Sequence, residues 1–357
     1  MTATSELAPS AAPVAPAPAP ALERLELGDP RWAAFATAHP DATPFHHPAW
    51  AGLLGRTYGF PAFALALVDG GRVVAGAPFL ETRTPARRRR WISLPFTDEV
   101  APLGAPALRA PFLEALGCSA EHPVQLRCPA EAPGWSNRQE AVIHVLDLDA
   151  DAETVRRGFS RSQVVRNIKR AEREGVEVRP ARTRADLDAF YALHARTRQR
   201  QGVPVQPRRF FDAIWTDMVE QGLATILLAS AGGPPLATAL FLHAGATTVY
   251  KFGASDPDGW PVRPNHLIFW TAIQDACARG HRRFDFGRTD LDNPGLRAFK
   301  SGWGATERPL VYAAVAPGAA SGEPSLAGRA MATAIQRGPA WLGRGLGAAL
   351  YRYAASR

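Results

Sequence analysis

Two glycine-centred turns organise the chain into halves that share one order of elements. The sequences DGG at 69–71 and AGG at 231–233 are typical of β-hairpin turns. They join strand-like runs at 63–68, 72–79, 224–229 and 235–243. In both halves helix-like segments precede the hairpin, and strand, helix and strand patterns follow it. This order predicts an α/β fold of mixed sheets in two tandem lobes, 22–150 and 151–316. One large mixed sheet is the less favoured alternative.

The ends of the chain differ in composition from the lobes. Residues 8–21 read PSAAPVAPAPAPAL, so we expect 1–21 to form a disordered Ala/Pro leader. Residues 317–357 predict a linker followed by a basic, broken C-terminal helix. We expect this helix to pack against the first lobe, and the alternative is peripheral contact with an anionic membrane surface.

Several classes of protein do not fit the sequence. No run of about 18 apolar residues is present, and the start lacks a signal-peptide pattern. Cys118, Cys128 and Cys277 form no metal-binding or disulfide pattern. We therefore expect no metal and a cytoplasmic protein with buried, reduced thiols.

Basic residues outnumber acidic ones, 41 to 33, which gives a net charge of +8. The excess gathers at 87–90, 156–173 and 329–357. A positive field attracts anionic partners such as nucleotide-linked precursors, tRNA and phospholipid headgroups, although each cluster also fits a solvated surface. No helix-turn-helix or zinc-finger pattern is present, so we expect no DNA partner.

A basic helix is predicted at 154–174, ended by Gly175. Asn167 lies in its middle, and its cations at helical spacing form one positive edge. These cations are Arg166, Lys169, Arg170 and Arg173. The edge could hold an anionic donor or acceptor, but ion pairs with neighbouring glutamates on a solvated face are slightly favoured.

Two strand ends carry candidate site residues. Tyr250 and Lys251 precede small residues, which allow a ligand or another backbone to approach closely, although a β-bulge would also explain them. Asp285 lies between two phenylalanines, so period-two alternation points it to the opposite face. Arg288 is expected just past the end of that strand, where α/β folds often bind ligands. A structural ion pair is an equally good explanation of Asp285.

The segment 295–305 (GLRAFKSGWGA) places an aromatic residue, a lysine and spaced glycines together. Phe299, Lys300 and Trp303 belong to it. A lysine ammonium and exposed backbone N–H groups can stabilise a phosphate or an oxyanion. This function is favoured over a loop lysine without a role.

Five segments together resemble the FemABX and BioF2-like acetyltransferase families. They are FHHPAW at 45–50, LPFTD at 94–98, N-x-x-R-A-x-x-x-G from Asn167, DFGR from Asp285 and FKSGWGA from Phe299. The resemblance covers roughly residues 40–315. It implies two GNAT-like lobes and acylation of an amine, with Phe299 and Lys300 against the phosphate region of the donor. The coiled-coil arm of many FemAB proteins is absent, and the acetyl-CoA pyrophosphate loop is not evident.

The resulting hypothesis is an aminoacyl- or acyltransferase that modifies an amine of a cell-wall (peptidoglycan) or surface-polymer precursor. The donor would be aminoacyl-tRNA or an acyl thioester, with no tightly bound cofactor, and the acceptor an anionic small molecule or glycan precursor. Lys300 and Asp285 are the candidate catalytic residues. Substrate binding is assigned to Tyr250, Lys251, Asn167, Arg170, Arg288, Phe299 and Trp303. Two alternatives stay open: acyl-CoA- or acyl-carrier-dependent N-acylation in exopolysaccharide or lipid synthesis, and a non-catalytic glycan-precursor binding protein. We expect a cytoplasmic location, with the inner face of the membrane as an alternative.

Overall fold

The computed structural model describes residues 19–83 and 88–315. The first half follows the predicted order. Its elements are β1 (Ala21–Glu26), α1 (Pro30–Ala38), α2 (Pro48–Tyr58), β2 (Ala62–Asp69), β3 (Arg72–Arg83), β4 (Arg89–Ile92), β5 (Leu103–Gly104), a 3-10 turn (Pro106–Leu108), α3 (Arg109–Ser119), β6 (Val124–Leu126) and β7 (Trp135–Asp147). Local chemistry explains the helix starts. Asp29 and His47 cap α1 and α2 through their side chains, and proline occupies the first turn of each helix.

The second half repeats the pattern of helices, hairpin, strand, helix and strand. Its elements are α4 (Ala152–Arg156), a π-helical turn (Arg161–Val165), α5 (Arg166–Arg173), β8 (Glu177–Pro180), α6 (Arg184–Arg200), α7 (Arg208–Ile214), a second π-helical turn (Trp215–Val219), β9 (Ala224–Ser230), β10 (Ala237–Ala244), β11 (Thr247–Ser255), a 3-10 segment (Pro257–Val262), α8 (Pro264–Ala278), β12 (Arg283–Thr289), α9 (Pro294–Ser301) and β13 (Thr306–Val315). Thr183 begins α6 with a complete capping box that uses Asp186.

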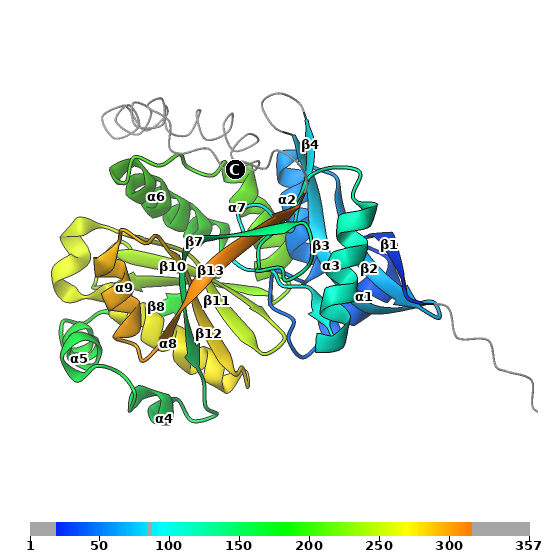
Figure 1. Cartoon of the computed structure of the whole chain (residues 1–357). Helices are drawn as coiled ribbons and strands as arrows, with labels where there is room; N and C mark the ends of the chain where they lie inside the picture. Colours follow the sequence, from blue (N-terminus) through cyan, green and yellow to red (C-terminus); the bar gives the residue numbers. More distant parts are fainter. Residues whose placement is uncertain (1–18, 84–87, 316–357) are drawn as a thin grey trace, which may run out of the picture.

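The strands of both halves form one continuous mixed sheet. The order β1-β2-β3-β4-β6-β13-β7-β12-β11-β10-β9-β8 gives a 13-stranded sheet, with β5 beside β3. The last strand, β13, lies between β6 and β7, and β7 also pairs with β12. In Figure 1, β7 and β13 cross between the blue-to-cyan half and the green-to-orange half. The chain therefore has both the repeated order of elements and the single large sheet that was the less favoured alternative. The proposed lobe boundary at residue 150 stays a prediction.

The halves also share a hydrophobic core. Helix α2 packs with α6 and α7 of the second half around the aromatic residues Trp50, Phe190, Phe210 and Phe211. A second core lies on the opposite face of β12, where α8 and the end of α9 cover Phe284 and Phe286. Because both cores are fixed around β11 and β12, the site between the lobes rests on rigid elements.

Three local expectations were wrong, and one helix, at 294–301, was not predicted. The helix 154–174 is broken at 157–160, where Ser160 caps the following turn and its backbone N–H donates to Gly302. The segment 294–301 is a helix, capped by Asn293. Arg288 lies within β12, because the strand continues past a bulge. Cys118 is exposed.

The remaining expectations concern the two ends of the chain, membrane-spanning helices and metal sites. The C-terminal helix and all but the last three residues of the leader lie outside the described residues. Within residues 19–83 and 88–315, no helix has the length and apolar character needed to cross a bilayer. The same residues contain no cluster of metal-binding side chains.

Candidate active site

The neighbouring strands β11 and β12 separate at the centre of the sheet. They pair in parallel only from Thr247 to Val249, opposite Arg283 to Asp285. Beyond this point β11 carries a bulge at Lys251, and Gly287 adopts a φ of 70°. A side chain at Gly287 would place its Cβ 3.1 Å from both the Tyr250 carbonyl oxygen and Asp98 Oδ2. Glycine is therefore required where the two strands diverge.

Lys300 reaches this opening from the last turn of α9. Its side chain is buried, and the ammonium donates to the carbonyl oxygens of Gly287 (2.7 Å) and Arg288 (3.0 Å). Burial lowers the pKa of Lys300 to about 8, although nearby carboxylates, Asp98 first among them, oppose the shift. The ammonium is therefore charged at neutral pH. A lysine has three N–H donors and these two bonds use two of them, so the third has no acceptor among the described residues.

Asp285 approaches the same glycine from β12. The predicted alternation is confirmed, because Phe284 and Phe286 are fully buried on the other face. The half-buried Asp285 carboxylate accepts a hydrogen bond from the Gly287 backbone N–H at 2.7 Å. Burial, reinforced by the negative charges of Asp98 and Glu99, raises the pKa of Asp285 to about 6. A carboxylate with this pKa is suited to accept a proton near neutral pH.

The first half contributes Asp98, which is positioned by the contact between the segments 45–50 and 94–98. Trp50 donates from its indole to the Thr97 hydroxyl at 3.0 Å, so the motifs at 45–50 and 94–98 pack together. Leu94 and Phe96 adopt positive φ angles of 64° and 60°, so this segment turns sharply just before Asp98. The Asp98 carboxylate then lies 3.7 Å from the ammonium of Lys251.

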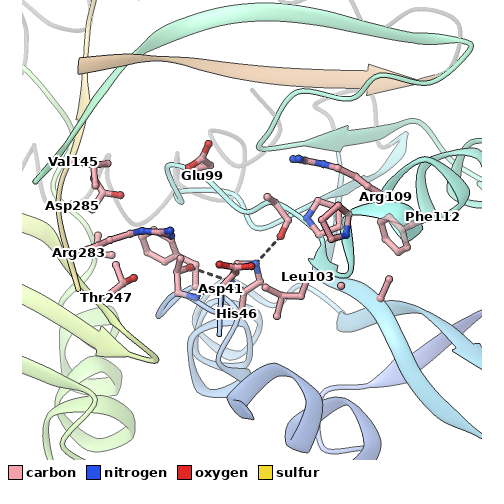
Figure 2. Close-up of a pocket in the computed structure, with 18 of the residues that line it drawn as sticks. Asp41, His46, Glu99, Leu103, Arg109, Phe112, Val145, Thr247, Arg283 and Asp285 are labelled. Atoms are coloured by element: carbon pink, nitrogen blue, oxygen red, sulfur yellow. Dashed lines mark hydrogen bonds between the residues drawn. The ribbon is translucent and has the colours of Figure 1, made fainter. Parts of the chain in front are cut away.

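A cavity of about 510 Å³ lies between the two halves and includes Asp285 in its wall. In Figure 2, Arg283, Thr247 and Asp285 lie on one side of it, and Arg109 and Phe112 lie on the other. Glu99 also lines the cavity and forms an ion pair with Arg308 at 2.7 Å. Positively and negatively charged side chains both line the cavity, so it can orient a polar ligand that has an amine and an anionic group.

His46 also lines the cavity but is poorly placed as a base. One ring nitrogen contacts the Ala101 carbonyl oxygen at 2.8 Å, and the other contacts the Thr43 backbone N–H at 3.0 Å. Burial lowers the pKa of His46 to about 4, so the ring is neutral at pH 7. Because both nitrogens are engaged with backbone groups, His46 holds the cavity wall in shape.

The structure brings four predicted site residues together at the opening. Lys251, Asp285 and Lys300 contribute their side chains around Gly287 and Asp98, whereas Tyr250 contributes its carbonyl oxygen and packs its ring against Phe269 on the other face. The Tyr250 hydroxyl lies against Gly253, where an added Cβ would be 2.0 Å away. Burial raises the pKa of Tyr250 to about 12, so the phenol keeps its proton.

Three further predicted residues lie behind the opening around His266 of α8. The ring of Phe299 is 5.4 Å from the His266 ring, and the ring of Trp303 is 6.1 Å from it. Asn167 lies 3.4 Å from the same imidazole and donates to the Gln163 carbonyl oxygen at 2.6 Å. They form a packed layer that supports α9.

Two predicted arginines are directed elsewhere. The guanidinium of Arg170 lies 3.9 Å from Glu174, as the ion-pair interpretation expected. That of Arg288 donates to Asp290 at 2.9 Å, while only its backbone carbonyl meets Lys300.

Sequence analysis missed several residues that line the site. Asp98 belongs to the segment 94–98, but its pairing with Lys251 depends on contacts between distant parts of the chain. Glu99, Arg109, Arg283 and Arg308 carry no local pattern, and only the sheet topology assembles them.

Comparisons with known proteins find relatives of parts of the sequence. Residues 158–301 match the family of acetyltransferase (GNAT) domains. A segment of 89 residues is 35% identical to a Lipid II:glycine glycyltransferase of Staphylococcus haemolyticus (strain JCSC1435), and covers 23% of this chain and 21% of that protein. A Staphylococcus aureus protein of the same name is 37% identical over 75 residues, 19% of this chain and 18% of its own length. The matched segments thus span about a fifth of these relatives.

Solved structures give the same fold over most of the chain. The crystal structure of FemX has a TM-score of 0.67 at 18% identity, covering 82% of this chain and 97% of that one. L-PGS from Bacillus licheniformis has a TM-score of 0.51 at 16% identity, covering 88% and 98%. The chain therefore has a GNAT-like α/β fold. The domain match and the segment identity support a FemABX-like family of acyl- or aminoacyltransferases.

Proposed function

We propose that the chain transfers an activated aminoacyl or acyl group to an amine of a cell-wall or surface-polymer precursor. One observation carries this proposal: two oppositely charged groups with shifted pKa values bind the backbone of the same residue, Gly287. Asp285 accepts from the Gly287 N–H, and Lys300 donates to the Gly287 carbonyl oxygen. Their pKa values, about 6 and about 8, leave a base and an acid together at neutral pH.

The proposed reaction is a direct attack of the acceptor amine on the donor carbonyl. A C–N bond forms and the C–O or C–S bond of the ester or thioester breaks. Asp285 takes the proton from the attacking nitrogen, and the free N–H of the Lys300 ammonium stabilises the oxyanion and supplies a proton to the leaving group. The rigid strands supply most of the remaining rate enhancement by aligning the two reactants.

The cavity suits an acceptor with both charges. Asp285 faces the amine, while the guanidinium groups of Arg109 and Arg283 line the wall that would hold an anionic part of the precursor. The curated relatives are named as glycyltransferases that act on Lipid II, which supports a membrane-linked glycan acceptor. We propose accordingly that the enzyme acts at the cytoplasmic face of the membrane.

The identity of the donor distinguishes this proposal from its rival, acyl-CoA- or acyl-carrier-dependent N-acylation. Aminoacyl-tRNA is favoured by the glycyltransferase similarity, whereas an acyl-CoA donor is favoured by the match of 158–301 to acetyltransferase domains. Both donors place a carbonyl next to a leaving oxygen or sulfur, so the same two residues would serve either one.

The test offers both donors to the purified chain. Labelled aminoacyl-tRNAs and acyl-CoAs would be incubated with peptidoglycan and surface-glycan precursors, and amide products identified by mass spectrometry. Transfer from aminoacyl-tRNA supports the proposal, and transfer from acyl-CoA alone supports its rival. Tight precursor binding with no transfer from either donor supports a non-catalytic glycan-precursor binding protein. Mass spectrometry of precursors from a deletion strain would then identify the physiological product.

A further inference from the structure

A second hollow lies on the outer surface of the second half. Helix α4, the segment 157–160, the π-helical turn and α5 surround it, with a volume of about 750 Å³. These helices lie at the periphery of the molecule in Figure 1. Glu153 is its only acidic lining residue, against six basic ones. We call this hollow the basic groove, and its cations are Arg156, Arg157, Arg161, Arg166, Lys169 and Arg173.

Most of these charges lack a neutralising partner. Arg161, Arg166 and Lys169 are exposed, and no carboxylate of a described residue forms an ion pair with them. Arg157 donates only to the hydroxyl of Thr154, at 2.8 Å. Cations that face one concave surface repel one another, so an anion that enters the groove would relieve this repulsion.

The floor of the basic groove is fastened to the helix that carries Lys300. The Ser160 N–H donates to the Gly302 carbonyl oxygen at 2.8 Å, only two residues past Lys300. Gly304 adopts a φ of 74°, and a Cβ there would lie 3.0 Å from the Gly158 carbonyl oxygen. The segment that lines the groove therefore contacts the chain just after α9, the helix that carries Lys300.

The lining favours a chain of phosphates over a lipid surface. A helix that lies on a membrane inserts apolar side chains between headgroups. The basic groove offers only Phe159, which is 4% exposed, and the half-buried Val165. The large hydrophobic residues that are exposed in the described chain are Trp260, Leu291 and Leu296, and none of them lines the groove. Six cations along two helices exceed what a single phosphate needs, and suit a phosphodiester backbone.

We propose that the basic groove binds the phosphodiester backbone of the RNA that carries the donor aminoacyl group. The proposal rests on the proposed function for the identity of the donor. The RNA would lie across α4 and α5, with its acylated end directed towards Lys300. Its sequence would matter little, since exposed guanidinium and ammonium groups read phosphates and not bases.

The test compares two variants that remove the same charge. R161Q/R166Q/K169Q removes three unpaired cations of the groove, and R72Q/R83Q/R138Q removes three exposed cations of the first half. Binding of a deacylated acceptor-stem RNA ending in CCA would be measured by fluorescence anisotropy at several salt concentrations. We expect the groove variant to bind at least about tenfold more weakly, with a salt slope smaller by about 3, while the control binds like the wild type. Equal affinity of both variants and the wild type overturns the proposal.

Two further experiments distinguish RNA from other anionic ligands of the groove, and distinguish the RNA site from the proposed transfer activity. Competition by coenzyme A at stoichiometric concentration, or binding of the wild type to phosphatidylglycerol vesicles in preference to RNA, would overturn the RNA assignment. With an aminoacylated acceptor-stem RNA, the groove variant should show a KM raised at least about tenfold and an unchanged kcat. With a short aminoacyl-dinucleotide, which cannot reach the groove, both variants should match the wild type. RNA binding without transfer from any donor would reject the proposed function but not the RNA site.

Discussion

The interlobe cavity and the basic groove use charge in opposite ways. Charges of both signs face one another in the cavity, where Glu99 pairs with Arg308, and beside it, where Lys251 pairs with Asp98. Burial shifts the pKa values of the lining residue Asp285 and of the neighbouring Lys300 towards neutrality. In the groove, charges of one sign face solvent with few partners. The difference assigns proton transfer to the cavity and attraction of an anion to the groove. It also predicts that substitutions of Asp285 and Lys300 change kcat, whereas those in the groove change the KM for the donor.

The largest expected effect follows from the replacement of Lys300. Lys300→Met keeps the length of the side chain but removes the donor to the Gly287 and Arg288 carbonyl oxygens. Loss of an oxyanion donor should lower kcat by about 100- to 1,000-fold. Leaving two carbonyl groups without a donor should cost about 1–3 kcal/mol in the free energy of unfolding. Steady-state kinetics and thermal unfolding measure the two effects.

Arg297→Gln on the same helix is the matched control. It removes a surface ion pair with Glu307, which contributes little to stability because solvent screens it, and it should leave kcat unchanged. A Lys300→Met enzyme that loses activity only in proportion to its folded fraction would show that Lys300 has a structural role alone.

A comparably large loss should follow from Asp285→Asn. The amide can still accept the hydrogen bond from Gly287 but cannot take up a proton, so kcat should fall by about 100-fold or more. The KM for the donor RNA should stay within about twofold, because the groove is untouched. A variant whose kcat equals that of the wild type would remove Asp285 from the mechanism.

The same substitution should alter how stability depends on pH. The folded pKa of Asp285, about 6, lies above the unfolded value of about 3.9. The stabilising contribution of the protonated carboxyl group is fully present below pH 4 and is lost as the pH rises through 6. Thermal unfolding should therefore show Asp285→Asn gaining stability relative to the wild type between pH 4 and pH 7. A constant difference across this range would contradict the raised pKa.

A smaller effect, on the pH dependence of the rate, is expected from Asp98→Asn. This substitution changes the charge beside the cavity and leaves the basic groove untouched. Asp98 contributes negative charge that raises the pKa of Asp285, so its removal should move the acid limb of the rate profile to lower pH by less than about one unit. Asp69→Asn, at an exposed hairpin turn, should cause no shift. An acid limb that moves upward would mean that the loss of the Lys251 partner dominates the site.

Local patterns predicted much of the fold and part of the site. The two hairpin turns and the strand alternation around Asp285 are set by near neighbours, and the structure confirms them. Helix α9 escaped notice because its apolar residues lie among glycines. The position of β13 between β6 and β7 depends on pairing between segments that are far apart in sequence. For the same reason, no pattern near Asp98 or Arg308 indicated that the two would line one site.

The pH dependence of kcat/KM in the wild type and in Asp285→Asn tests the central claim most directly. Wild-type transfer should fall below about pH 6, as Asp285 becomes protonated, and above about pH 8, as Lys300 loses its proton. Asp285→Asn should lose the acid limb and keep the alkaline one. An acid limb that persists unchanged in this variant would contradict the assignment of Asp285 as the group that accepts the proton of the amine.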